Sequence, residues 1–144
     1  MRLFTIGFTK KTGEEFFTRL QKARVKRVVD VRLNNTSQLA GFAKGRDLGY
    51  FLGAIAKIDY VHCPELAPTK EILDAFKKDK GSWAEYEESF AELLADRRIA
   101  ETVAGSLCDG DCLLCSEATP QHCHRRLVAE YIAEHGADVE VIHL

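Results

Sequence analysis

The residues best suited to chemistry in this sequence lie close together, between positions 113 and 126. This segment reads LLCSEATPQHCHRR and holds two thiols, a carboxylate and a cluster of histidine and arginine side chains. Two leucines run directly into the first thiol, which indicates the end of a buried strand, followed by a loop and a helix. Ligands bind at such junctions in open α/β sheets. The sequence therefore predicts a ligand site in this segment.

The helix that follows the loop decides which side chains face the site. Thr119 is the expected N-cap residue, with Pro120 at the first helical position. Helical periodicity then places His124 on the buried face of the helix, whereas Arg126 points towards solvent. His124 is thus expected to face inwards, within reach of Cys115 at the strand end.

Four side chains are candidates for catalysis. Cys123 lies near the start of the helix beside histidine and arginine, a setting that lowers the pKa of a thiol and activates it as a nucleophile. Asp30 or Glu117 would serve as the general base, and His124 would shuttle a proton. The alternative for Asp30 is a clamp that holds Arg32. Cys115, at the end of an apolar strand, is instead expected to be a packed thiol that contacts the ligand.

A second group of residues could hold an anion. Backbone N–H groups at a helix N-terminus attract negative charge, and Arg32 and Arg125 would add two cations. A phosphate or a carboxylate suits this arrangement. The alternative for Arg125 is a structural ion pair with Glu117 or Asp30. The remaining predicted ligand contacts are Gly7, Cys115 and Ser116.

Thiol and imidazole groups also form a candidate metal site. The soft ligands available for zinc are Cys115, Cys123, His122 and His124. Their spacing matches no standard zinc signature, so no cofactor is predicted outright and zinc stays an alternative. A further alternative is a domain that binds or senses a ligand in the same pocket without turnover.

The rest of the chain alternates between short apolar runs and amphipathic segments. The predicted strands cover residues 3–6, 27–31, 59–63, 112–115 and 139–144. The predicted helices begin near residues 12, 48, 69 and 119, with a break near residue 81 and a final end at Gly136. Trp83, Tyr86 and Phe90 are spaced as a packing stripe, with a stacking platform as the alternative. The polar stretch 33–47 is long, which is typical of functional loops.

Strands joined by helices predict a single-domain, three-layer α/β/α fold with a mostly parallel, Rossmann-like open sheet of about five strands. The carboxyl ends of parallel strands meet at one edge of the sheet. The residues expected at this edge are Gly7, Asp30, Arg32, His62, Cys63, Cys115, Ser116 and Glu117.

The composition restricts the class of protein. The 144 residues are 46% hydrophobic and 29% charged, with a net charge of −2, which is typical of a globular protein without strong affinity for nucleic acid. Neither a secretory signal nor an apolar run that could span a membrane is visible. Five cysteines without such a signal favour the cytoplasm. The expected function is that of a small enzyme of the hydrolase or transferase type, and the expected partner is a small anionic ligand that resembles a phosphate or a nucleotide.

Taken together, these motifs resemble the bacterial and archaeal family called domain of unknown function 488. The matching segments are TIG at 5–7, DVR at 30–32, YVHCPEL at 60–66, WAEY at 83–86 with Phe90, LLCSE at 113–117 and CHR at 123–125. The resemblance covers nearly the whole chain and implies a shared set of site positions, without an established activity. Two positions depart from the family pattern. Phe8 stands where a histidine is usual, and Ala67 where a glycine is common.

Overall fold

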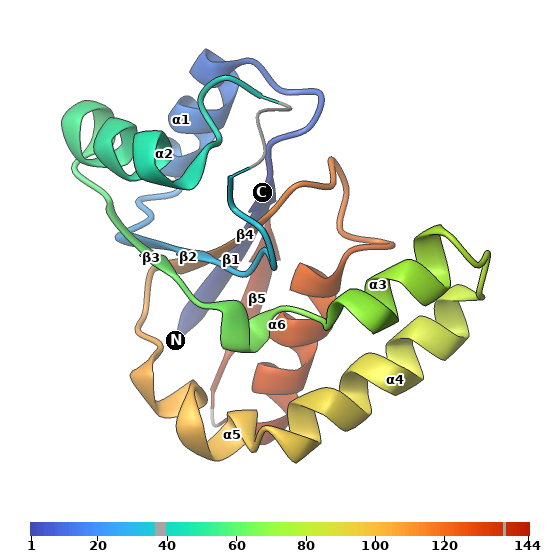
Figure 1. Ribbon diagram of the computed structural model, residues 1–144. Coiled ribbons are helices and arrows are strands. Elements are labelled where there is room, and N and C mark those ends of the chain that lie inside the picture. Colours follow the sequence, from blue (N-terminus) through green and yellow to red (C-terminus); the bar gives the residue numbers. More distant parts are fainter. Residues whose placement is uncertain (37–39, 137) are drawn as a thin grey trace.

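The computed structural model describes residues 1–36, 40–136 and 138–144, and its centre is a five-stranded parallel sheet. The strands are β1 (Arg2–Gly7), β2 (Arg27–Asp30), β3 (Asp59–His62), β4 (Asp111–Cys115) and β5 (Glu140–His143). Their order across the sheet is β3-β2-β4-β1-β5 (Figure 1). Each strand end agrees with the prediction to within one residue, so the predicted parallel α/β fold is confirmed.

Helices cover both faces of this sheet (Figure 1). One face carries α1 (Gly13–Lys22) and α2 (Gly45–Phe51), the latter continued by a π-helical turn at Leu52–Ala56. The other face carries α3 (Lys70–Lys77), α4 (Trp83–Asp96), α5 (Ile99–Thr102) and α6 (His124–His135), with short 3₁₀ turns at Pro64–Leu66 and Ala104–Ser106. The predicted cap of α1 is confirmed, because the Thr12 hydroxyl accepts the Glu15 N–H at 3.1 Å.

Strand β4 shows how the sheet separates two hydrophobic cores. Cys112 and Leu114 pack with the core of α1 and α2, whereas Leu113 and Cys115 pack with the core of α4 and α6. Successive strand residues face opposite sides of a sheet, so Cys112 and Cys115 are kept apart by the backbone. Of these two thiols, Cys115 is the one that faces α6.

The start of α6 differs from the prediction. The helix begins at His124, with an extended Cys123 as N-cap residue, and residues 119–120 belong to the preceding loop. The Glu117 carbonyl of this loop accepts a hydrogen bond from Arg125 Nη1 at 2.7 Å. Because this contact draws the loop back towards the sheet, regular helix begins only after it. The predicted end of the helix at Gly136 is confirmed.

The strand register brings the predicted site residues to one edge of the sheet. Gly7 of β1 lies beside Cys115 of β4, and Asp30 of β2 lies beside Leu114. The loops that follow these strands therefore meet the start of α6, as expected for a parallel sheet. Over the described parts of the chain, no helix combines the length and the apolar character needed to cross a bilayer.

Candidate functional site

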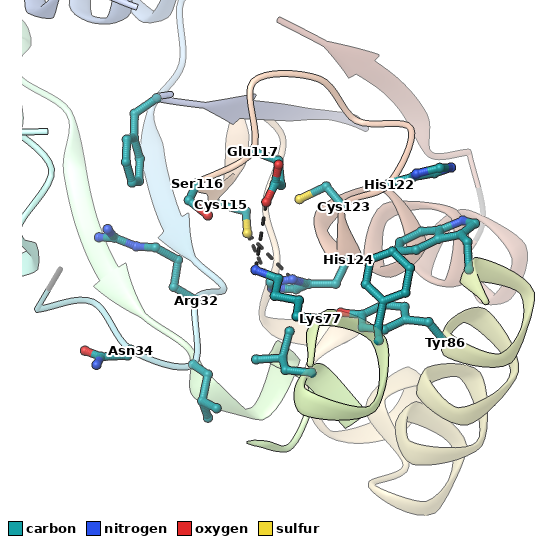
Figure 2. A pocket seen from close by; sticks show the side chains of 15 residues that line it. Arg32, Asn34, Lys77, Tyr86, Cys115, Ser116, Glu117, His122, Cys123 and His124 are labelled. Atoms are coloured by element: carbon teal, nitrogen blue, oxygen red, sulfur yellow. Dashed lines mark hydrogen bonds and ion pairs between the residues drawn. The ribbon is translucent and has the colours of Figure 1, made fainter. Parts of the chain in front are cut away.

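A cavity of about 350 Å³ opens at this edge of the sheet (Figure 2). Its lining residues are Phe8, Arg32, Leu33, Asn34, Leu73, Phe76, Lys77, Trp83, Tyr86, Cys115, Ser116, Glu117, His122, Cys123 and His124. The predicted site residues that lie outside this lining are Gly7, Asp30 and Arg125. The predicted loop contributes Leu33 and Asn34, while its residues 37–39 lie outside the described parts of the chain.

Arg32 lines the cavity, and one of its donors has no partner among the described residues. Its side chain is buried, and Nε and Nη2 donate to the two oxygens of the Asp30 carboxylate at 2.9 and 2.7 Å. The guanidinium carbon lies 5.2 Å from the centre of the Phe8 ring. Nη1 is buried and has no hydrogen-bond partner among the described residues. Asp30 thus balances the charge of the guanidinium, and Nη1 is the donor that is left for another partner.

Asp30 is placed to hold Arg32. Its carboxylate is fully buried and also accepts the Tyr60 hydroxyl at 2.6 Å. Burial and this hydrogen bond raise the pKa of Tyr60 to about 12, so the phenol keeps its proton. The general-base role predicted for Asp30 stays a prediction. In the structure, both of its oxygens are engaged by neighbouring side chains.

Cys115 ends β4 and lines the cavity although only 4% of the residue is exposed. The adjacent Cys123 thiol lowers the pKa of Cys115 by hydrogen bonding to its sulfur, against the opposing effect of burial. The backbone N–H groups of Ser116 and Glu117 and the positive charge of Arg125 lower it further. The balance leaves the pKa of Cys115 below that of an ordinary thiol.

Cys123 shows the opposite behaviour, and the prediction of a lowered pKa there is wrong. The hydrogen bond to Cys115, together with burial, raises the pKa of Cys123 above its usual range. A thiol that donates its proton to a neighbouring sulfur is harder to ionise, and this effect outweighs the favourable position at the start of a helix. Cys123 therefore keeps its proton and stabilises negative charge on Cys115.

His124 is buried, as predicted, and its ring is held by the backbone of the neighbouring strand. Nε2 lies 2.7 Å from the Val31 carbonyl, which assigns the proton to Nε2 and leaves Nδ1 as an acceptor. Burial lowers the pKa of His124, so the imidazole is neutral. The Cys115 sulfur lies 3.6 Å from Nδ1 and 3.8 Å from Nε2. The sulfur is therefore close to both ring nitrogens.

Three residues of this site carry the soft donor atoms that zinc binding would need. The donor atoms of Cys115, Cys123 and His124 lie within 4.8 Å of one another. A metal ion would bind His124 through Nδ1, because Nε2 contacts the Val31 carbonyl. The fourth predicted ligand, His122, stacks on Trp83 at a ring distance of 4.9 Å. Zinc binding stays a prediction.

Arg125 and Gly7 shape the loop that borders the cavity. Arg125 is fully buried and donates to the Glu117 carbonyl at 2.7 Å and to the Thr5 hydroxyl at 3.4 Å. A Cβ atom at Gly7 would overlap this carbonyl oxygen, so the close approach requires glycine. Within the described ranges, no carboxylate forms an ion pair with Arg125. The predicted pairing of Arg125 with a carboxylate is therefore absent there.

The predicted packing stripe has a second role at the cavity. Tyr86 and Phe90 are core residues with Trp83 packed against them, as predicted, but Trp83 and Tyr86 also line the cavity, and their rings stack at 4.7 Å and 14°. Phe76 of α3 lies 5.4 Å from the Trp83 ring. We call Phe76, Trp83 and Tyr86 the aromatic wall. Arg126, expected in solvent, lies over the Trp83 ring and pairs with a glutamate of α4.

Fold and cavity together define a parallel α/β protein with a thiol–imidazole site at the carboxyl edge of its sheet. Residues 12–132 match the family described as Domain of unknown function DUF488, and the chain belongs to this family. Comparison with curated proteins gave no match, and neither did comparison with solved structures. The resemblance seen in the sequence motifs is thereby confirmed.

Proposed function

We propose that this protein is a small cytoplasmic enzyme, of the hydrolase or transferase type, that attacks an anionic ligand with the sulfur of Cys115. One observation carries the proposal: the side chains of Cys115 and Arg32 line the same cavity, and Arg32 Nη1 has no hydrogen-bond partner among the described residues. A ligand oxygen bound at Arg32 would bring the adjacent electrophilic atom towards the sulfur. Five free thiols are in keeping with a reducing compartment.

The surroundings of Arg125 support an ionised Cys115. A buried charge is costly unless it is paired, and the described residues offer Arg125 no carboxylate. Its positive charge favours the thiolate form of Cys115 by lowering the pKa. The thiolate would therefore serve as the counter-ion that Arg125 otherwise lacks. In this arrangement the nucleophile needs no separate base to activate it.

In the proposed reaction, the Cys115 thiolate donates an electron pair to a phosphorus or carbonyl carbon of the ligand, and an S–P or S–C bond forms. The leaving group departs with the electron pair of the bond that breaks and takes up a proton. Water, or a second acceptor in a transferase, then attacks the covalent intermediate and loses a proton. Cys115 is released as the thiolate.

Glu117 and His124 are the candidates for moving these protons. Glu117 lines the cavity, its side chain is half exposed, and one oxygen lies 3.9 Å from Lys77 Nζ. It could give a proton to the leaving group and accept one from water. His124 could carry a proton only through Nδ1, because Nε2 is held by the Val31 carbonyl.

The proposal predicts that Cys115 is the most reactive thiol towards a small alkylating reagent. At pH 7 we expect iodoacetamide to label Cys115 about tenfold faster than the exposed Cys108, because a larger fraction of Cys115 is thiolate. Peptide mass spectrometry over a time course measures both rates in one sample of folded protein. Inorganic phosphate should slow the labelling of Cys115 and leave that of Cys108 unchanged.

Two variants of Cys123 serve as matched controls. Cys123→Ala removes the donor to Cys115 and should slow its labelling, while Cys123→Ser keeps a donor and should restore it. Labelling of Cys115 no faster than that of Cys108 would contradict the proposal. If Cys123 were labelled faster than Cys115, Cys123 would be the nucleophile, as the sequence predicts.

A further inference from the structure

We infer that the cavity selects a ligand in which a planar aromatic ring is joined to the anionic group, with the ring against the aromatic wall and the anion at Arg32. The position of the anion at Arg32 is taken from the proposed function, on which this inference depends. The new element is the aromatic ring, because the proposed reaction specifies only the anionic part of the ligand.

The rings of the aromatic wall are packed against one another in the absence of a ligand. Its three rings support one another, with Tyr86 4.7 Å from Trp83 and 5.5 Å from Phe76. Side chains that are already held in place lose little freedom on binding, so an apolar group is bound at a small entropic cost. Rings of this kind prefer offset or edge contacts with other planar rings. The wall therefore favours an aromatic group over an aliphatic one of similar size.

A heteroaromatic ring already stacks at this place. The imidazole of the exposed His122 lies 4.9 Å from the Trp83 ring, at an interplanar angle of 25°. None of the hydrogen bonds between described residues holds His122 there. A ligand ring can take over this stacking position by displacing an exposed side chain, which requires no rearrangement of the core.

Two residues that line the cavity each carry a buried donor without an acceptor among the described residues: Arg32 Nη1 and Trp83 Nε1. Buried donors are normally satisfied, so each is expected to have a partner in the complex. Arg32 Nη1 suits an oxygen of the anion. Trp83 Nε1 suits an acceptor atom on the ring, which favours a heteroaromatic or oxygen-substituted ring.

The arrangement of the side chains fits a ligand with two different ends. Figure 2 shows Arg32 and Asn34 on one side of the cavity and Tyr86 and His122 on the other, with Cys115 and His124 between them. A ring at one end and an anion at the other would thus leave the connecting bond near the sulfur. The volume of about 350 Å³ suits a small ligand of this kind.

The inference is tested by comparing phenyl, cyclohexyl and methyl phosphate as ligands of the Cys115→Ser protein, in which no covalent step occurs. Trp83 is the single tryptophan of the chain, so its fluorescence reports on the cavity directly. We expect phenyl phosphate to change this fluorescence and to bind about tenfold more tightly than methyl phosphate, because its ring is buried. Cyclohexyl phosphate should bind more weakly than phenyl phosphate.

Two variants, measured by calorimetry, and a protection experiment with iodoacetamide test the same ligand preference. By calorimetry, Trp83→Leu should reduce the affinity for phenyl phosphate to that for methyl phosphate. Tyr50 is an exposed aromatic residue of α2 that lies outside the cavity, so Tyr50→Leu should change neither affinity. In the wild-type protein, phenyl phosphate should protect Cys115 from iodoacetamide at lower concentration than methyl phosphate does.

Equal affinities for the phenyl and cyclohexyl compounds, or no binding of any probe, would overturn the inference. The proposed function fails on a different result, namely slow labelling of Cys115 in the absence of any ligand. If the protein prefers phenyl phosphate but its Cys115 is unreactive, the result supports the ligand class and contradicts the thiol mechanism.

Discussion

Replacing Asp30 with alanine is expected to lower the free energy of unfolding by about 3–5 kcal/mol, the cost of leaving one member of a buried ion pair without its partner. The side chains of Asp30 and Arg32 are 0% and 5% exposed, so solvent cannot take over the charge of the guanidinium. The variant also removes the acceptor of the Tyr60 hydroxyl. Denaturant unfolding followed by circular dichroism measures the loss.

An exposed ion pair provides the control for this variant. Arg98 and Glu101 form a pair whose side chains are 71% and 61% exposed, and Glu101→Ala should change the stability by less than about 1 kcal/mol. Similar small losses for both variants would show that Arg32 finds another partner, or water, when Asp30 is absent. The account of Arg32 as a donor fixed by Asp30 would then be wrong.

Replacing Gly7 with alanine is expected to cost about 3 kcal/mol of stability, at the upper end of the usual range for overpacking a well-filled site. The added methyl group would overlap the Glu117 carbonyl oxygen, which is backbone and cannot turn away as a flexible side chain can. The loop after β4 would have to shift, and the hydrogen bond from Arg125 to this carbonyl would weaken. Thermal and denaturant unfolding measure the change.

Gly105→Ala is the matched control, because a Cβ atom at this position meets nothing within 4 Å. We expect this variant to change the stability by less than about 0.5 kcal/mol. The Gly7 variant should also label more slowly at Cys115, since the displaced loop carries the N–H groups that favour the thiolate. Normal stability together with normal labelling would contradict the close packing of loop and strand.

Local patterns in the sequence sufficed to predict the strands and most of the helices. Thr12 and Gly136 mark helix ends through contacts within a few residues, so their effect is visible without knowledge of the fold. The parallel sheet also followed from local information, because strands that alternate with helices need helical crossovers between parallel neighbours. The carboxyl edge could thus be predicted as the location of the site.

The start of α6 could not be predicted in this way. Thr119 and Pro120 form a good local signal for a helix start, yet they lie in a loop. The structure favours the loop because Arg125 is buried against Glu117 and Gly7 leaves room for the carbonyl between them. Contacts between residues far apart in the chain therefore outweighed the local signal.

By itself, the sequence determined the edge of the sheet at which the cavity lies and most of the residue types that line it, since strand ends and helix faces follow from short-range periodicity. Tertiary structure alone decided that Cys115 rather than Cys123 has the lowered pKa, and that Arg32 rather than Arg125 faces the cavity. The tertiary structure also placed the aromatic wall of Phe76, Trp83 and Tyr86 along the cavity. The pKa of a thiol and the exposure of a side chain depend on distances between elements that only the packed fold sets.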